Sequence, residues 1–361
     1  MSLRDFEILS KLGSGSYSSV YKVRRRADSH LYALKQVSLG TLAAREKANA
    51  VNEVRILASM SSPHVVAYYE AFLDYNSGSL CIVMEYADGG DLLERIKQGR
   101  KLDLRLTEEE IWTIFGAMVQ GLSALHDMHI LHRDIKSANV FLTSTGGAKL
   151  GDLNVAKVME AGLHNTQTGT PYYASPEVWK DQPYDFKSDI WSLGCVLYEM
   201  AALEPPFTAN DMDSLYRKVV KGLYTPLSDS YSPDLSIMIR NLLQVNPNAR
   251  PSSKRLLQLL TRGGHIQHSP PTPTLLLKTI RFPKNLRELD HAFPSPKYHP
   301  THIHNISFDK REVSSRNKSM SQRSESTRPR ERRMSQLKES MGAKLPPIFR
   351  LPAVRHSKDQ V

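Results

Sequence analysis

The chain has 361 residues, of which 40% are hydrophobic and 24% are charged, so it is not disordered throughout. Its apolar runs are shorter than the roughly 20 residues that a membrane-spanning helix needs. The N-terminus also lacks the apolar core of a secretory signal. Two cysteines, Cys81 and Cys195, exclude a disulfide framework and a four-ligand zinc site. We therefore expect a cytoplasmic protein without a membrane span.

The net charge of +11 belongs to the C-terminal part of the chain. Residues 1–260 hold 28 Lys and Arg against 29 Asp and Glu, whereas residues 261–361 hold 20 against 8. This distribution excludes a uniformly basic nucleic-acid-binding fold. The apolar periodicity ends near Thr261, where Pro, Ser, Arg, Lys and His become frequent. We predict a folded domain over 4–260 and a basic Ser/Pro-rich tail over 261–361 that is mostly disordered.

The N-terminal part of the chain alternates apolar and polar residues in the manner of β-strands. Three strands are predicted between residues 4 and 37, followed by a helix at about 42–60. The apolar stretches 65–72 and 79–86 predict two more strands. We therefore expect a β-rich N-terminal lobe over about 4–85.

From about residue 90 to 260 the apolar spacing becomes helical. Thr107 and Glu110 form a Thr-x-x-Glu capping box, which predicts the start of a long helix. The predicted class is α+β, with a small β-rich lobe and a larger helical lobe, and the cleft between them is the natural ligand site. Another helix is expected at about 188–202. A further helix should begin with Pro233 at its first helical position, and the last helix of the folded part should end at Gly263.

Two features of the N-terminal lobe indicate phosphate binding. Gly13 and Gly15 lie in a Gly-rich turn, where the backbone can approach phosphate oxygens and offer N–H groups, although a plain turn has the same pattern. Lys35 follows with apolar neighbours, and an inward-facing lysine needs a carboxylate to offset its desolvation. Glu53 on the next helix can supply this carboxylate, with Glu46 as the alternative.

Two further features follow the long helix. The segment His132–Asn139, HRDIKSAN, combines a base, a cation and an amide that can bind a metal ion. A polar turn after a helix does not require this set. Asp152 follows a short apolar stretch, and on its own it would be interpreted as a turn residue.

Together these residues resemble the landmarks of eukaryotic protein kinases in their order and spacing. The landmarks are a Gly-rich loop, a strand lysine, a helix glutamate, an HRD loop, a DFG-like triplet, and SPE in the place of APE. The resemblance covers about residues 4–260 and implies the bilobal protein-kinase fold. Segments such as TGTPYYASPEVW and KSDIWSLGCVLYEM are similar to the NIMA-related (Nek) serine/threonine kinases, as is the stretch that begins at Leu275.

The resemblance implies a site for ATP and Mg²⁺. Lys35, paired with Glu53, would hold the α/β-phosphates, and Lys136 would neutralise charge on the transferring phosphoryl group. Asp134 would accept the hydroxyl proton or orient the nucleophile. The Mg²⁺ ligands would be Asn139 and Asp152. The other residues implied to line the ATP site are Leu12, Gly13, Gly15, Val20, Ala33, Met84, Glu85, Ala87, Asp91 and Phe141.

The resemblance also implies how the substrate side is held. Thr170, in the P+1 loop, would contact Asp134 and Lys136. A bridge from Glu177 to Arg250 would tie down the activation segment, and Asp189 would brace the HRD loop. We predict that phosphorylation of Thr166 or Thr168 orders the activation segment through Arg133, the alternative being that both are plain turn residues.

The sequence therefore predicts a serine/threonine kinase that acts on protein substrates. One alternative is a pseudokinase scaffold, because Ser18 replaces the third glycine of the loop and Asn154 replaces the DFG glycine. A second alternative is a cytoskeletal binding protein in which the basic tail makes the binding contacts. The Nek resemblance implies a cell-cycle, microtubule or ciliary role, at the cytoskeleton, the centrosome or the basal body and cilium.

The basic tail allows several interpretations. It is either a solvated segment, a contact for microtubules or another anionic surface, or a phosphorylation target. The stretch Lys278–Phe282, KTIRF, matches the loose pattern for docking type-1 protein phosphatase, a pattern that often arises by chance. We see no sustained heptads, so no coiled-coil dimer is predicted.

Overall fold

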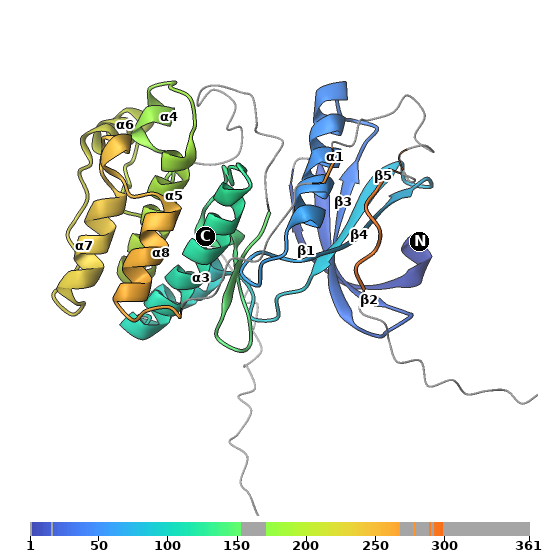
Figure 1. The fold of residues 1–361 in the computed structure, drawn as a ribbon, viewed down its shortest axis with the longest axis horizontal. Helices are drawn as coiled ribbons and strands as arrows, with labels where there is room; N and C mark the ends of the chain where they lie inside the picture. The colour runs from blue at the N-terminus through green and yellow to red at the C-terminus, as the bar shows by residue number, and fades with distance from the viewer. Residues whose placement is uncertain are drawn as a thin grey trace, which may run out of the picture. The chain divides into compact units, whose positions relative to one another are not determined.

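A computed structural model describes residues 2–15, 17–152, 171–267, 277–278, 289 and 292–298. In this part of the chain an antiparallel five-stranded sheet with one long helix precedes a helical region (Figure 1). The predicted α+β class and the order of a β-rich lobe before a helical lobe are thus confirmed. No helix in these ranges combines the length and the apolar character that crossing a bilayer requires.

The N-terminal lobe is a sheet with the strand order β1-β2-β3-β5-β4, in which all neighbours are antiparallel. Helix α1 packs on one face of this sheet, because Val51, Val54 and Leu57 point from the helix into a shared apolar cluster. The elements are β1 Phe6–Ser14, β2 Ser18–Arg25, β3 Leu31–Ser38, α1 Ala44–Ser59, β4 Tyr68–Asp74 and β5 Ser79–Glu85.

The helical lobe is built around α3 (Glu108–Asp127) and α5 (Phe186–Ala202). Every residue of α5 from Ser188 to Ala201 is buried, as expected of a helix surrounded by other elements on all sides. The hairpin of β6 (Val140–Leu142) and β7 (Ala148–Leu150) lies beside α3. The other helices in the described ranges are α2 Leu92–Leu102, α4 Pro176–Trp179, α6 Met212–Lys221, α7 Pro233–Leu242 and α8 Ser253–Arg262.

Local capping signals set several helix ends. Thr107 Oγ1 accepts a hydrogen bond from the Glu110 backbone N–H at 3.2 Å, and Glu110 Oε2 accepts one from the Thr107 N–H at 2.8 Å. The predicted capping box is therefore present and starts α3. Helix α5 begins two residues earlier than predicted, because Asp185 caps it. Gly263 ends α8 as predicted.

The folded part extends beyond the predicted boundary at residue 260. His265 stacks on Trp112 in the helical lobe, with ring centroids 4.0 Å apart. Leu289 is fully buried in the apolar cluster beneath α1, and Tyr298 stacks on Tyr69. Parts of the segment predicted to be mostly disordered thus pack on the folded domain, because they carry apolar and aromatic residues. Residues 299–361 lie outside the described part of the chain.

Candidate active site

Lys35, in the middle of β3, lies in a group of three charged side chains. Its Nζ lies 2.8 Å from Glu53 Oε1 on α1 and 2.8 Å from Asp152 Oδ1, which follows β7. The predicted pair of Lys35 and Glu53 is therefore present. The alternative partner, Glu46, instead accepts a hydrogen bond from the Ala43 N–H at the start of α1.

The electrostatics of this group keep Lys35 charged. Burial acts against its ammonium, but the nearby carboxylates of Glu53 and Asp152 outweigh this effect and raise the pKa of Lys35. Burial of Asp152 also acts to raise its pKa, but the Lys35 ammonium reverses the direction and holds the pKa of Asp152 below its ordinary value. Both groups therefore carry their charges at neutral pH.

A second polar group lies in the loop that precedes β6. Asp134 Oδ2 accepts hydrogen bonds from Lys136 Nζ at 2.9 Å and from Asn139 Nδ2 at 3.0 Å. Asn139 Nδ2 also donates to the Asp134 carbonyl at 2.8 Å. These contacts fix the carboxylate of Asp134. Because the amide nitrogen of Asn139 is engaged with Asp134, its carbonyl oxygen is the atom that it can offer to a metal ion.

Asp189, fully buried in α5, holds the backbone of this loop. Its carboxylate accepts hydrogen bonds from the backbone N–H groups of His132 and Arg133, each at 3.0 Å. Arg133 has a φ of 66°, a left-handed conformation that a non-glycine residue adopts only when its surroundings impose it. The predicted bracing by Asp189 is thus seen in the geometry.

Two further partners of Asp189 were not predicted from the sequence. His126 Nε2 lies 2.9 Å from Asp189 Oδ2, and the Tyr184 hydroxyl donates to Oδ1 at 2.5 Å. Burial opposes ionisation of Asp189, but the contact with His126 and the other hydrogen bonds lower its pKa. His126 lies 63 positions from Asp189, so no local pattern could indicate this contact.

The strand register aligns several of the residues implied to line the ATP site. Val20 lies opposite Gly13 on one side and Lys35 on the other, and Ala33 lies opposite Met84. A Cβ atom added at Gly13 would meet no atom within 4 Å. The structure places Gly13 in β1, just before the predicted turn, and leaves open space beside its backbone, as phosphate binding requires.

Glu85 at the end of β5 and Asp91 before α2 have their side chains engaged in structural contacts. Glu85 Oε1 lies 3.1 Å from Lys149 Nζ, and Glu85 Oε2 accepts a hydrogen bond from the Ala67 N–H at 3.2 Å. The Glu85 side chain is therefore engaged within the protein, and the place of Glu85 and Ala87 in the ATP site stays a prediction. Asp91 accepts a hydrogen bond from the Glu94 N–H at 2.9 Å and caps α2, a structural role that was not predicted.

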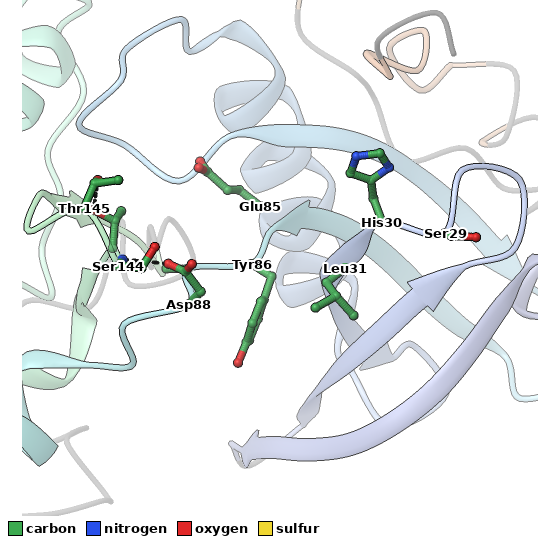
Figure 2. Close-up of a pocket in the computed structure, with 10 residues that line it drawn as sticks. Ser29, His30, Leu31, Glu85, Tyr86, Asp88, Ser144 and Thr145 are labelled. Atoms are coloured by element: carbon green, nitrogen blue, oxygen red, sulfur yellow. Dashed lines mark hydrogen bonds between the residues drawn. The ribbon is translucent and has the colours of Figure 1, made fainter. Parts of the chain in front are cut away.

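A pocket of about 570 Å³ opens on this same segment (Figure 2). Its lining comes from residues 29–31, 85–88 and 143–145, and at one edge Asp88 Oδ1 accepts a hydrogen bond from the Ser144 N–H at 2.8 Å. Neither Lys35 nor Asp134 lines this pocket. The candidate active site is therefore identified by the polar contacts of Lys35 and Asp134 and not by this pocket.

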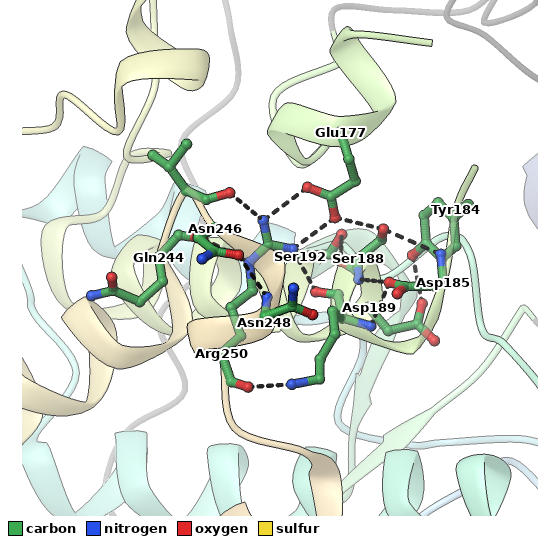
Figure 3. A network of polar contacts seen from close by, with 12 residues as sticks. Glu177, Tyr184, Asp185, Ser188, Asp189, Ser192, Gln244, Asn246, Asn248 and Arg250 are labelled. Carbon is green, nitrogen blue, oxygen red and sulfur yellow. Dashed lines mark hydrogen bonds and ion pairs between the residues drawn. The ribbon is translucent and has the colours of Figure 1, made fainter. Parts of the chain in front are cut away.

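A buried ion pair joins the activation segment to the helical lobe (Figure 3). Arg250 Nη1 and Nη2 lie 2.7 and 2.8 Å from the two carboxylate oxygens of Glu177, and both side chains are almost completely buried. Ser188 Oγ also donates to Glu177 at 2.7 Å. Although burial acts in the opposite direction, the contact with Arg250 lowers the pKa of Glu177. The predicted bridge is therefore present.

Tyr173 adds a contact that was not predicted. Its hydroxyl donates to Glu199 Oε2 at 2.7 Å and lies 3.0 Å from Ser137 Oγ. Ser137 directly follows Lys136, so Tyr173 connects the loop that precedes β6 to α5. The other predicted residues of the activation segment, Thr166, Thr168, Thr170 and Asn154, lie outside the described residues.

The donor set of the site fits Mg²⁺. In the described ranges no three His, Cys, Asp or Glu side chains come together as a metal site. Asp152 and Asn139 instead offer one carboxylate and one amide oxygen, and Mg²⁺ at a nucleotide site takes few protein ligands because phosphates and water supply the rest. The Gly151 N–H donates to the backbone carbonyl of Asn139 at 3.0 Å, which holds the two segments together and leaves the side-chain oxygen of Asn139 out of that bond.

Comparisons with known proteins agree with this geometry. Residues 6–260 match the protein kinase domain family. The chain is 41% identical over 257 residues to the serine/threonine-protein kinase Nek5 of Mus musculus, which covers 70% of this chain and 40% of Nek5. It is 40% identical over 259 residues to the probable serine/threonine-protein kinase nek2 of Dictyostelium discoideum, with 70% and 61% covered. The chain thus spans less than two thirds of the length of these relatives.

Proposed function

We infer that this chain, which belongs to the protein kinase family and within it to the Nek serine/threonine kinases, is an active kinase. We propose that it transfers the γ-phosphoryl group of ATP to Ser and Thr hydroxyls of other proteins. The observation that carries the proposal is the position of Lys35 between Glu53 and Asp152. The fixed group of Asp134, Lys136 and Asn139 supports it.

The side chains have the charges that this transfer needs. The substrate hydroxyl oxygen attacks the γ-phosphorus, and the bond from that phosphorus to the β–γ bridging oxygen breaks, releasing ADP. Asp134 accepts the hydroxyl proton or orients the hydroxyl as the new bond forms. Lys136 neutralises charge on the transferring group, and Lys35 holds the other phosphates. Most of the catalysis is therefore positioning and charge neutralisation.

Asn139 and Asp152 would hold Mg²⁺ with the phosphates. When bound, the ion supplies charge neutralisation and orients the phosphate oxygens. Asp152 contributes a carboxylate that stays ionised because Lys35 holds its pKa low. Asn139 contributes a neutral oxygen whose direction is fixed by its hydrogen bonds to Asp134.

The experiment that tests the proposal is transfer of radiolabelled phosphate from Mg-ATP to casein or a Ser/Thr peptide. We expect transfer by the wild-type chain and its loss in Asp134→Asn. A folded wild-type chain that binds ATP but transfers no phosphate, even after treatment with an upstream kinase, would contradict the proposal. That result would favour the pseudokinase scaffold and direct attention to Ser18 and Asn154.

Regulation by phosphorylation is a separate proposal on the activation segment. Thr166 and Thr168 are the candidate phosphate acceptors, and Arg133, next to Asp134, is the candidate cation. Phosphate mapping of active protein should find one of the two modified. Full activity of the double Thr→Ala variant would contradict this proposal.

A second candidate function rests on the charge of residues 261–361, which hold 20 Lys and Arg against 8 Asp and Glu. We propose that this tail binds microtubules or another anionic surface, at the cytoskeleton, the centrosome or the base of a cilium. Co-sedimentation with microtubules that weakens as salt rises is the expected result. Docking of type-1 phosphatase at Lys278–Phe282 is tested by the loss of capture in Phe282→Ala.

A further inference from the structure

The chain that follows the last helix of the kinase domain returns to the N-terminal lobe. We use the name clasp for its described residues Leu277, Lys278, Leu289 and 292–298. Residues 292–298 run beside the sheet, as the orange segment near β2, β4 and β5 in Figure 1 shows. Strand β4 is an edge strand of this sheet, so one side of its backbone is open to a further segment. The Lys297 N–H donates to the Tyr69 carbonyl of β4 at 2.8 Å.

The clasp also holds the C-terminal end of helix α1. The side chain of Lys297 donates to the carbonyl of Ala58, one of the last carbonyls of the helix, which have no partner inside it. The Leu277 N–H donates to Ser59 Oγ at 3.0 Å, and Arg55 Nη1 donates to the Leu277 carbonyl at 3.3 Å. Two separate points of the clasp therefore hold the last turn of α1.

Aromatic contacts fix the far end of the clasp. The ring of Tyr298 stacks on Tyr69 at 5.6 Å and meets the edge of Tyr32 at 5.5 Å. The Arg25 guanidinium lies 3.6 Å from the centre of the Tyr298 ring, and the Tyr298 hydroxyl donates to Glu70 Oε2 at 3.0 Å. Such ring and cation contacts are stabilising beyond the area that they bury.

Leu289 joins the clasp to the apolar core of the lobe. Its side chain is fully buried in the cluster that contains Val51, Val54 and Leu57, the sheet-facing residues of α1. Phe293 packs against the same cluster. These α1 residues flank Glu53, so a segment that packs on them acts on the orientation of the Glu53 side chain.

We propose that the clasp, through Lys297 and Tyr298, holds the last turn of α1 against β4 and thereby positions Glu53 for its contact with Lys35. Lys297 and Tyr298 are positioning residues, since neither touches the charged group itself. The inference rests on the proposed role of Lys35 and Glu53 in ATP binding. It assigns to residues after the kinase domain a part in the activity of that domain.

The test uses the full chain with Tyr298→Ala and Lys297→Ala. The matched control is Tyr75→Ala, which removes an exposed tyrosine on the turn between β4 and β5. Hydrogen exchange of the backbone amides of α1 is compared with that of α5, and kcat/KM for ATP is measured. We expect exchange in the last two turns of α1 to be about tenfold faster in both variants, with α5 unchanged. We expect kcat/KM to fall by about three- to tenfold, and Lys297→Arg and Tyr298→Phe to restore most of it.

Two results would overturn the proposal. One is wild-type exchange and activity in both alanine variants. The other is an equal increase of exchange in α1 and α5, because that shows a general loss of stability without a specific effect on α1. If the wild-type chain transfers no phosphate, the proposed function fails, yet the exchange of α1 still decides whether the clasp holds the helix.

Discussion

At the scale of single residues, the site depends on one buried ammonium that two carboxylates share. Lys35 and Glu53 have side chains that are only 13% and 9% exposed, so the surrounding protein gives little of the solvation that water would supply. Removing Lys35 leaves two carboxylates without their counter-charge, and removing Glu53 leaves the buried ammonium with Asp152 alone. The Lys35 group is therefore more sensitive to substitution than an exposed ion pair of the same length.

We predict that Glu53→Gln lowers kcat/KM for ATP by about ten- to a hundredfold, since a hydrogen bond to a charged group contributes about 1.5–3 kcal/mol. The amide cannot offer a charge to Lys35, which then turns toward Asp152 alone. Steady-state kinetics at varied ATP measure the effect. Glu46→Gln is the matched control, because Glu46 lies on the same helix but caps its start. Equal loss in both variants would show that Glu53 has no special role.

At the scale of the elements, the starts of α3 and α7 and the end of α8 could be predicted because their signals are local, whereas α2, α4 and α6 were not predicted. Thr107 and Glu110 are three residues apart, and Pro233 follows its own cap, so each signal can be seen in a short stretch of sequence. The motif order likewise indicated Lys35 with Glu53. The hydrogen bond from the Tyr173 hydroxyl to Glu199 could not be predicted, because the sequence around a loop tyrosine does not indicate which helix its side chain will contact.

We predict that Glu177→Gln lowers the free energy of unfolding by about 3–5 kcal/mol, since it leaves the buried guanidinium of Arg250 without a counter-charge. Urea unfolding at pH 7 measures the change. Lys254→Ala is the control, because its partner Asp127 and its own side chain are well exposed and the pair contributes less than about 1 kcal/mol. Similar midpoints for the two variants would contradict the prediction.

The same ion pair predicts a pH dependence. The folded-state pKa of Glu177 lies below its ordinary value, so its contribution to stability is complete above that value of about 4.3 and is lost as pH falls through the folded pKa. The wild-type chain and Glu177→Gln should therefore differ most at neutral pH and approach each other at lower pH. Urea midpoints at pH 7, 5 and 3.5 test this, and a gap that stays constant would be the contrary result.

Tyr173→Phe should affect the protein substrate more than ATP. It removes the hydroxyl that joins Glu199 to Ser137 beside Lys136, and leaves Glu199, a buried carboxyl, without that donor. We predict a loss of about threefold to tenfold in kcat/KM for a peptide substrate, with KM for ATP unchanged. Tyr172→Phe is the neighbouring control. An equal effect on both substrates would assign Tyr173 to general stability.

At the scale of the whole molecule, the contacts that the sequence did not reveal join residues far apart in the chain. Tyr298 meets Glu70 across 228 positions, and Leu277 meets Ser59 across 218. The stretch that carries Leu277 and Tyr298 is rich in Pro, which is typical of disorder, although it also holds apolar residues such as Leu277 and Leu289. Only the surface that these isolated residues meet on the N-terminal lobe explains why they pack.

We therefore predict that a chain ending at Gln267 is less stable than one ending at His302. The shorter chain lacks the buried side chain of Leu289, which contributes about 1.5–3 kcal/mol, and the stacking of Tyr298, which adds about 0.5–1.5 kcal/mol. Calorimetry should show a midpoint at least about 4 °C lower, because a domain of this size loses about 2–4 °C per kcal/mol. Equal midpoints would contradict this prediction and would indicate that the folded unit ends near residue 260. In the longer chain, Leu289→Ala should reproduce most of the shift, since it removes the same buried side chain without removing the segment that carries it.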